Sequence, residues 1–171
     1  MGGDQAPGPI VDGAVAAARH VPRGVRLVGR RADVDRELSR HPDAASLPLT
    51  VVDAADVVGM AESPAAALRR KPGSSIRVAV QELAQGRASG LVSAGSTGAT
   101  VMAAYAGLGL LPGVDRPALA TTIPTRQQPA VLLDAGANAE CRPGHLLQFA
   151  VMGAVYAQVA LGVADPRVGL L

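Results

Sequence analysis

The feature that most constrains this chain is a regular alternation of short apolar segments with longer segments of helical pattern. Residues 25–29 and 49–52 are rich in valine and leucine and are bounded by glycine, proline or aspartate, which is typical of buried strands. Strands that alternate with helices at this spacing predict a parallel or mixed sheet covered by helices on both faces. We therefore expect the α/β class, as an open three-layer α/β/α sandwich with a mostly parallel sheet.

The alternation continues along the chain without an internal repeat or a low-complexity linker. The predicted helices cover residues 10–19, 32–40, 63–71, 74–85, 99–111 and 143–161. The predicted strands cover residues 25–29, 49–52, 91–93, 119–123, 131–133 and 167–171. A chain of 171 residues can bury roughly 70% of its unfolded surface, which is enough for one sizeable core. We expect a single domain over residues 1–171.

Both ends of this pattern are interrupted. The Gly2-Gly3-Asp4 segment is the kind of loop that follows a strand, and residues 167–171 stop in the middle of a predicted strand. We expect the fold to be incomplete at both ends, with residues 1–171 forming part of a longer chain.

Composition excludes several other classes of protein. With 49% apolar and 18% charged residues the chain does not have the composition of a disordered protein. A formal net charge of +2 and only three aromatic residues argue against a nucleic-acid-binding surface. Cys141 is the single cysteine, so no internal disulfide is expected, and a reducing cytoplasm is the simplest compartment. The longest apolar stretch, residues 149–163, is interrupted by Gly153 and Gln158 and is too short to predict a membrane span.

The strongest local motif is the segment 93–99, with the sequence SAGSTGA, which joins a predicted strand to a predicted helix. Such a turn directs several backbone N–H groups and the positive end of the helix at one point, which is how proteins hold phosphate. The motif lacks the lysine of a P-loop and the GxGxxG pattern of dinucleotide-binding folds. Two interpretations stay open: an anion site, or a plain turn with a serine cap. The candidate binding residues are Ser93, Gly95, Ser96, Thr97 and Gly98.

Two further segments carry polar or charged residues of possible functional value. Asp134 to Asn138 follows a continuous apolar strand, so its polar groups are expected at the carboxyl edge of the sheet, where ligands collect in α/β folds. The alternative is an Asp/Asn turn that satisfies its own backbone. Arg69, Arg70 and Lys71 bring three cations together, either to meet an anionic partner or as a solvated helix end.

Taken together, six segments of the chain resemble the phosphate acyltransferases of bacterial phospholipid synthesis, and the resemblance runs the full length. The matching segments are MGGDQAP (1–7), SPAAALRRKPGSSI (63–76), SAGSTGA (93–99), PGVDRPALA (112–120), LLDAGANAECRPGHLLQFAVMGAVYA (132–157) and PRVGLL (166–171).

The resemblance implies a specific activity and fold. It implies transfer of a fatty acyl group from acyl carrier protein to inorganic phosphate, giving an acyl-phosphate that a membrane glycerol-3-phosphate acyltransferase consumes. It also implies a fold like that of the isocitrate and isopropylmalate dehydrogenases, a homodimer, and no cofactor or metal. The enzyme is expected in the cytoplasm, at the membrane surface in its full-length form.

The resemblance also assigns roles to the candidate residues. Ser93 and residues 95–98 are implied to bind phosphate or acyl-phosphate, while Asp4, Asp134 and Asn138 shape the pocket. The cations Arg69, Arg70 and Lys71 are implied to contact acyl carrier protein or phosphate.

Several positions depart from the family pattern. Gln5 stands where the family usually has histidine, Ser96 replaces a common asparagine, and Pro72-Gly73 replaces a basic-polar pair. The resemblance implies a chain of about twice this length. It also implies that the family's catalytic residues lie beyond Leu171. Two alternatives stay open: a related phosphotransacetylase that uses acyl-CoA, and an inactive fragment that binds only phosphate or a partner.

Overall fold

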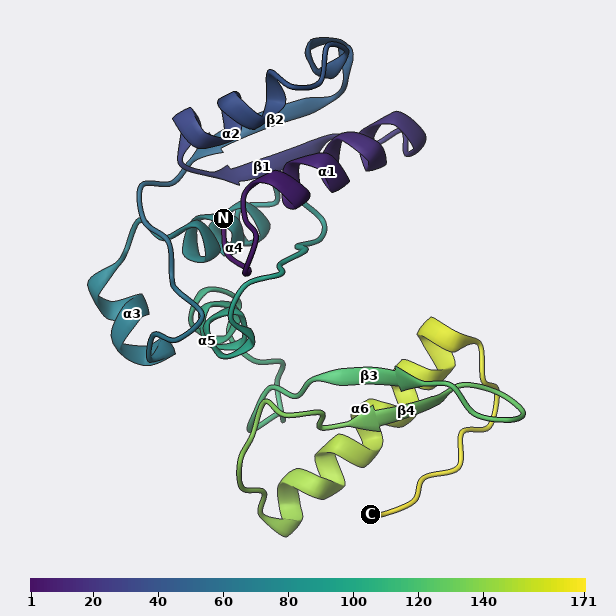
Figure 1. Ribbon diagram of the computed structural model, residues 1–171. Coiled ribbons are helices and arrows are strands. Elements are labelled where there is room, and N and C mark those ends of the chain that lie inside the picture. The colour runs from purple at the N-terminus through teal and green to yellow at the C-terminus, as the bar shows by residue number, and fades with distance from the viewer. The chain divides into compact units, whose positions relative to one another are not determined.

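A computed structural model describes all 171 residues, and their contacts cluster into two compact units, Met1–Gly109 and Leu110–Leu171 (Figure 1). Each unit has its own pair of strands. The α/β class is therefore confirmed, whereas the single domain and the large sheet stay predictions for the full-length protein.

The first unit is built on a short parallel sheet. Its elements are α1 (Gly8–His20), β1 (Val25–Gly29), α2 (Arg31–Leu38), a 3-10 turn (Ala44–Ser46), β2 (Leu49–Asp53), α3 (Pro64–Arg70), α4 (Ser75–Ala84) and α5 (Thr97–Leu108). Strands β1 and β2 pair in parallel from Val25 opposite Leu49 to Gly29 opposite Asp53. The helices are those predicted, with α5 beginning two residues earlier and ending three residues earlier than expected.

Helices cover both faces of this sheet because side chains alternate along β1. Leu27 packs with Val11 and Val15 of α1 and with Val34 of α2 in one buried cluster. The neighbouring Arg26 points to the other face, where its Nε atom lies 2.7 Å from Glu82 Oε2 of α4, although its N–H bond is not directed at that oxygen. The first unit is thus a small three-layer arrangement.

A second cluster in the same unit joins helices α3, α4 and α5. Its buried members are small or medium apolar side chains, namely Val58, Ala67, Leu68, Val80, Ala99 and Ala103. The helices approach closely: a Cβ atom on Gly107 would lie 2.5 Å from Val80 Cγ1. This packing fixes the start of α5, which carries the SAGSTGA turn.

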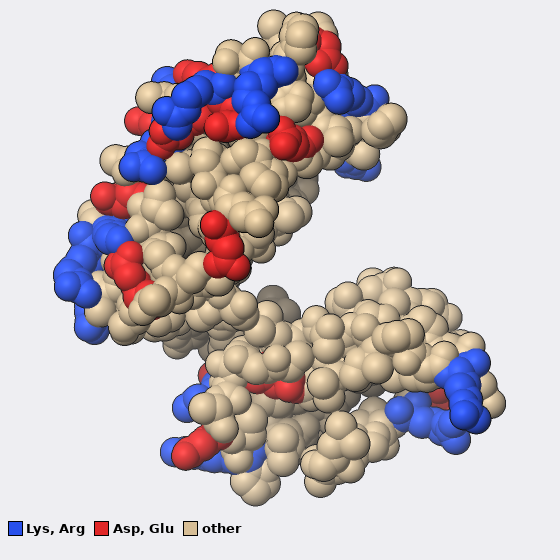
Figure 2. Space-filling model, in the orientation of Figure 1, with Lys and Arg blue, Asp and Glu red and all other residues tan.

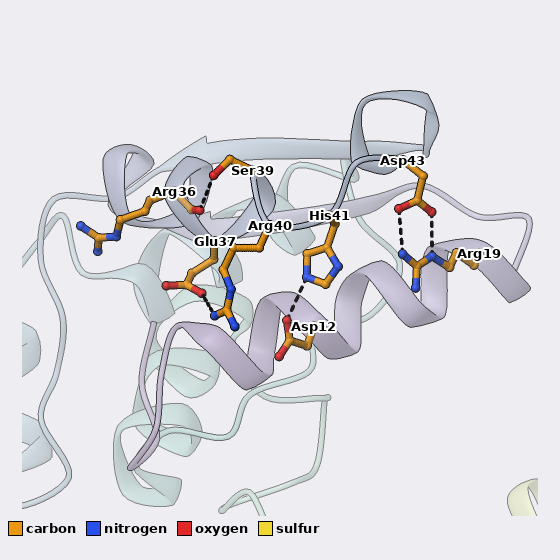
Figure 3. Close-up of polar contacts among 8 residues, drawn as sticks. All are labelled: Asp12, Arg19, Arg36, Glu37, Ser39, Arg40, His41 and Asp43. Carbon is orange, nitrogen blue, oxygen red and sulfur yellow. Dashed lines mark hydrogen bonds and ion pairs between the residues drawn. The ribbon is translucent and has the colours of Figure 1, made fainter.

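Charged side chains on the outer surface of α1 and α2 are interspersed rather than segregated by sign (Figure 2). Arg19 pairs with Asp43, and Arg40 with Glu37, each at 2.7 Å, while His41 Nε2 lies 2.9 Å from Asp12 Oδ1 (Figure 3). Exposed pairs of this kind contribute about 0–1 kcal/mol each. The pairs Arg19–Asp43 and Asp12–His41 join α1 to the segment after α2.

The second unit consists of β3 (Ala120–Ile123), β4 (Ala130–Leu133) and α6 (Pro143–Leu161). The strands are antiparallel, from Ala120 opposite Leu133 to Ile123 opposite Ala130, an orientation that the expected mixed or mostly parallel sheet allows. The physical reason is the connection, because residues 124–129 suffice for a hairpin whereas a parallel crossover needs about a dozen residues or more. Helix α6 packs against β4.

Two predicted strands do not form. Residues 91–93 and 167–171 have no strand structure, and Val92 is 99% exposed. A strand needs a neighbour to accept and donate its backbone hydrogen bonds, and neither segment has one within residues 1–171. The apolar pattern of each segment predicts a strand, but it does not show whether a neighbouring strand is present to pair with it.

Helix α6 is longer than the apolar stretch at residues 149–163, which was judged too short for a membrane span. It has 19 residues and a mean hydropathy of 1.3, so by length and composition alone it could cross a membrane. Core helices of soluble proteins meet the same criterion, so this property does not assign a membrane span.

Candidate anion-binding site

The turn at residues 93–98 leads directly into helix α5. Ser96 is the residue that caps the helix, because its Oγ accepts a hydrogen bond of 3.4 Å from the N–H of Ala99. Thr100 Oγ1 donates to the Ser96 carbonyl oxygen at 3.1 Å, which reinforces the same turn. The serine cap predicted from the sequence is therefore present.

The backbone N–H groups of the turn fall into two sets. Those of Gly95 and Ala99 donate to the hydroxyls of Ser93 and Ser96. Those of Ser96, Thr97 and Gly98 have no acceptor within the protein. N–H groups at the start of a helix, together with the helix dipole, favour an anion. The cap and the anion site, which the sequence left as alternatives, are thus compatible with each other.

The amino-terminal loop packs tightly on this turn. A Cβ atom on Gly3 would lie 2.9 Å from the Ala94 carbonyl oxygen, and one on Gly2 would lie 3.3 Å from the Gly95 Cα. The φ values are also positive, 101° at Gly3 and 127° at Gly2. A side chain at either position would therefore strain the backbone as well as crowd the turn. Ser75 Oγ of α4 donates to the Met1 carbonyl oxygen at 3.1 Å and holds the loop in place.

The hydroxyls of the turn converge on a hollow of about 20 Å³, lined in part by Gly2, Ser75, Ser93, Ser96 and Thr100. A hollow of this size holds about one water molecule. That volume is too small for a tetrahedral oxyanion, whereas Thr97 and Gly98 are exposed to solvent. Asp4, in the amino-terminal loop, is exposed and makes no hydrogen bond, so its role in a pocket stays a prediction.

The second predicted loop, at Asp134, lies in the second unit, and the Asp134 carboxylate is hydrogen-bonded by groups of the protein itself. The Asp134 carboxylate accepts hydrogen bonds from the N–H groups of Leu119 at 2.8 Å, Ala137 at 3.0 Å and Asn138 at 2.8 Å. The Asn138 side-chain amide donates to Asp134 and to the Pro117 carbonyl oxygen. These contacts are those of the Asp/Asn turn, and a contact of either side chain with substrate stays a prediction.

The Asp134 environment acts on its ionisation in two directions. Burial alone would raise the pKa of the carboxyl group, but the hydrogen bonds from Leu119, Ala137 and Asn138 stabilise the carboxylate and leave the pKa below its ordinary value. Asp134 is therefore an anion that already occupies the centre of its own loop.

The three predicted cations have different surroundings. Lys71 Nζ donates to Glu62 Oε1 at 2.5 Å and to the Val57 carbonyl oxygen at 2.7 Å, so its charge is neutralised within the protein. This pairing lowers the pKa of the Glu62 carboxyl. Arg69 and Arg70 are exposed and pair with no carboxylate.

Sequence reasoning missed Ser75 and Thr100, which the fold brings beside the turn. Thr100 lies one helical turn after Ser96, a spacing that could have pointed to it. Ser75 offered no comparable signal, since its contact with Met1 joins residues far apart in the chain. No group of three or more His, Cys, Asp or Glu side chains is arranged to hold a metal ion.

The fold and the turn define a class: an α/β protein that carries free backbone amides at a glycine-rich helix start. The comparisons with known proteins identify the family within that class. The family described as "Fatty acid synthesis protein" matches residues 1–171, and the chain belongs to it.

Relatives in this family carry the name predicted from the resemblance. "Phosphate acyltransferase" of Heliobacterium modesticaldum is 50% identical over 171 residues, which cover 100% of this chain and 51% of the relative. The protein of the same name from Anaeromyxobacter sp. strain K is 51% identical over 172 residues and is covered to 47%. The predicted resemblance is confirmed, and the chain spans about half the length of the curated relatives it matches.

Proposed function

We propose that the full-length protein transfers a fatty acyl group from acyl carrier protein to inorganic phosphate and releases acyl-phosphate. The observation that carries this proposal is the set of unpaired N–H groups at Ser96, Thr97 and Gly98, in a chain whose relatives are named phosphate acyltransferase. The proposal needs a site for one small anion and no nucleotide, and the turn has that character.

The chemistry assigns a defined task to the turn. Phosphate binds to the three amides, which orient one of its oxygens toward the thioester carbonyl carbon. That oxygen forms a bond to the carbon, and the carbonyl oxygen becomes negatively charged in a tetrahedral intermediate. The intermediate collapses by breaking the carbon–sulfur bond, and the thiolate leaves and takes a proton. Ser93 and Gly95 hold the shape of the turn, because the Gly95 N–H group donates to Ser93 Oγ within it.

The finer fold and the cellular setting belong to the same proposal. An isocitrate dehydrogenase-like sandwich needs further strands beside β1, and β1 pairs only with β2. A groove of about 1090 Å³ runs along β1 and is also lined by α1, α4 and residues 87–94, which leaves room for such strands. We also propose a cytoplasmic homodimer that passes its reactive acyl-phosphate to a membrane glycerol-3-phosphate acyltransferase.

Removal of a single amide tests the phosphate site. Thr97 occupies the first helical position, where proline is tolerated, and Ser96 has φ and ψ of −55° and 119°, which suit a residue before proline. Thr97→Pro therefore deletes one N–H group while keeping the helix, and Thr97→Ala is the matched control that retains it. We expect Thr97→Pro in the full-length enzyme to lower kcat/KM for phosphate about 10- to 100-fold, because one hydrogen bond to a charged group contributes about 1.5–3 kcal/mol.

The control variant and the choice of donor decide the interpretation. Thr97→Ala is expected to stay within about threefold of the unchanged enzyme, because its N–H group is retained. Equal rates for Thr97→Pro and the unchanged enzyme would remove the turn from the mechanism. A preference for acyl-CoA over acyl carrier protein as donor would favour a phosphotransacetylase. If neither donor gave acyl-phosphate, the protein would be interpreted as one that only binds phosphate or a partner.

A further inference from the structure

The carboxyl end of α3 gathers four cations from two helices and the turn between them. Arg69 and Arg70 end the helix, Lys71 follows it, and Arg77 of α4 donates from Nη1 to the Leu68 carbonyl oxygen at 3.0 Å. Figure 2 shows the blue side chains grouped over α3. Glu62 is the one carboxylate that forms an ion pair with any of them, and its partner is Lys71.

This group differs from the other arginines of the first unit. Most of those are held by carboxylates: Arg19, Arg26, Arg30, Arg36, Arg40 and Arg87. Arg69 and Arg70, by contrast, form no ion pair. Arg70 Nε donates one hydrogen bond of 3.3 Å to the Ala66 carbonyl oxygen, and Arg69 donates none. The helix dipole accounts for cations at this end of α3, but not for two exposed guanidinium groups that form no ion pair.

We propose that Arg69, Arg70 and Arg77 form a docking surface, the α3 basic surface, for an acidic face of the protein that carries the acyl group. This inference rests on the proposed function and names the contact that delivers its donor. Lys71 is not part of the surface because Glu62 already neutralises it. Unpaired surface charge of one sign guides an oppositely charged protein and sets its orientation.

The position of α3 fits this role. The helix begins at Pro64, whose ring lies so close to Gly98 that a Cβ atom there would be 2.9 Å from Pro64 Cγ. Seven residues at about 1.5 Å each place the other end of the helix about 10 Å further on. A carrier docked on Arg69 and Arg70 would therefore stand about one short helix away from the amides of the turn, at a distance that a flexible acyl-bearing arm can bridge.

Two other anions fit the surface less well. Inorganic phosphate is best held in a recess with converging donors, whereas Arg69 and Arg70 are exposed and border neither of the cavities described above. An anionic membrane attracts basic residues by about 1 kcal/mol each and is recognised by clusters of about four to eight of them. The α3 basic surface has three.

Charge reversal in the full-length enzyme tests the proposal. The double variant Arg69→Glu with Arg70→Glu is compared with a double variant at α2, Arg36→Glu in the helix and Arg40→Glu two residues after its end, which makes the same change in net charge at exposed positions. Each variant is assayed with acyl carrier protein and with acyl-pantetheine, a donor that has the thioester but no protein. We expect the α3 variant to lower kcat/KM for the carrier about 10-fold to 100-fold at low salt, mainly through KM, with the loss shrinking at high salt.

The donors and controls separate the possible outcomes. Unchanged rates of the α3 variant with acyl-pantetheine, and of the α2 variant with both donors, support docking at α3. Equal losses in the two variants, or an equal loss with both donors, overturn it, as does a change confined to binding of vesicles that contain anionic lipid. If the unchanged enzyme forms no acyl-phosphate, the proposed function fails. Binding of acyl carrier protein to the unchanged and α3-variant proteins, measured by fluorescence anisotropy, then still decides whether the surface docks it.

Discussion

The turn at 93–98 and the loop at 134–138 have similar sequences and opposite chemistry. Each contains glycine, follows an extended apolar segment and presents several backbone N–H groups. In the second loop the Asp134 carboxylate accepts most of those groups. In the first, only neutral hydroxyls are present. They accept the N–H groups of Gly95 and Ala99, while those of Ser96, Thr97 and Gly98 stay free.

The difference lies in the charge that the protein supplies. A carboxylate stabilised by several N–H groups is itself the bound anion, so it repels a second one. A hydroxyl accepts a hydrogen bond without adding charge, so the positive field at the start of α5 is preserved for a ligand. The N–H groups of the loop at 134–138 are therefore taken up by the Asp134 carboxylate, whereas the turn at 93–98 keeps free N–H groups for a ligand.

The largest effect expected from this comparison is on stability in the second loop. Asp134→Ala removes the acceptor of several N–H groups and should lower the free energy of unfolding by about 2 kcal/mol, since hydrogen bonds to a charged group contribute about 1.5–3 kcal/mol. Urea unfolding of the full-length protein measures it. Asn138→Ala, which removes two side-chain hydrogen bonds to acceptors, should cost less. An Asp134→Ala protein of unchanged stability that has lost activity would instead make Asp134 a substrate-binding group.

A smaller effect should appear on acidification. The pKa of Asp134 is lower in the folded protein than its ordinary value of about 3.9, so its contribution to stability is complete above that value. The contribution is lost as the pH falls through the lower, folded pKa. Below about pH 4, the unfolding free energy of the unchanged protein should therefore fall more steeply than that of Asp134→Asn. Parallel pH profiles for the two proteins would contradict the assignment.

The sequence was sufficient to predict the elements whose signals are local. Residues 25–29 and 143–161 form the strand and the helix predicted for them, because apolar pattern, proline and glycine mark their ends. Residues 91–93 were predicted as a strand and are not one, because pairing depends on a neighbour that local pattern does not reveal. The orientation of β3 and β4 could have been predicted from the short connection at 124–129.

The candidate site was predictable in position but not in its hydrogen bonds. The glycine and hydroxyl pattern identified the turn at 93–98 and its link to a helix. Which hydroxyl accepts which N–H group depends on side-chain rotamers, and sequence spacing does not fix them. The same limit applies to Lys71, which the sequence grouped with two arginines and the fold pairs with Glu62.

The smallest effect, and the finest test of the open turn, concerns Ser93. Its Oγ accepts hydrogen bonds from the Gly95 N–H at 3.2 Å and from Thr100 Oγ1 at 3.3 Å, so it already has two donors within the protein. Ser93→Ala removes an exposed hydroxyl and should change stability by no more than about 0.5 kcal/mol. The KM for phosphate should stay within about twofold, because the three free amides are retained and the variant removes no charge. Ser96→Ala is the contrasting variant, since loss of the helix cap should cost about 1 kcal/mol. A tenfold rise in the phosphate KM of Ser93→Ala would show that this hydroxyl binds phosphate directly, and the assignment of phosphate to the amides alone would then be wrong.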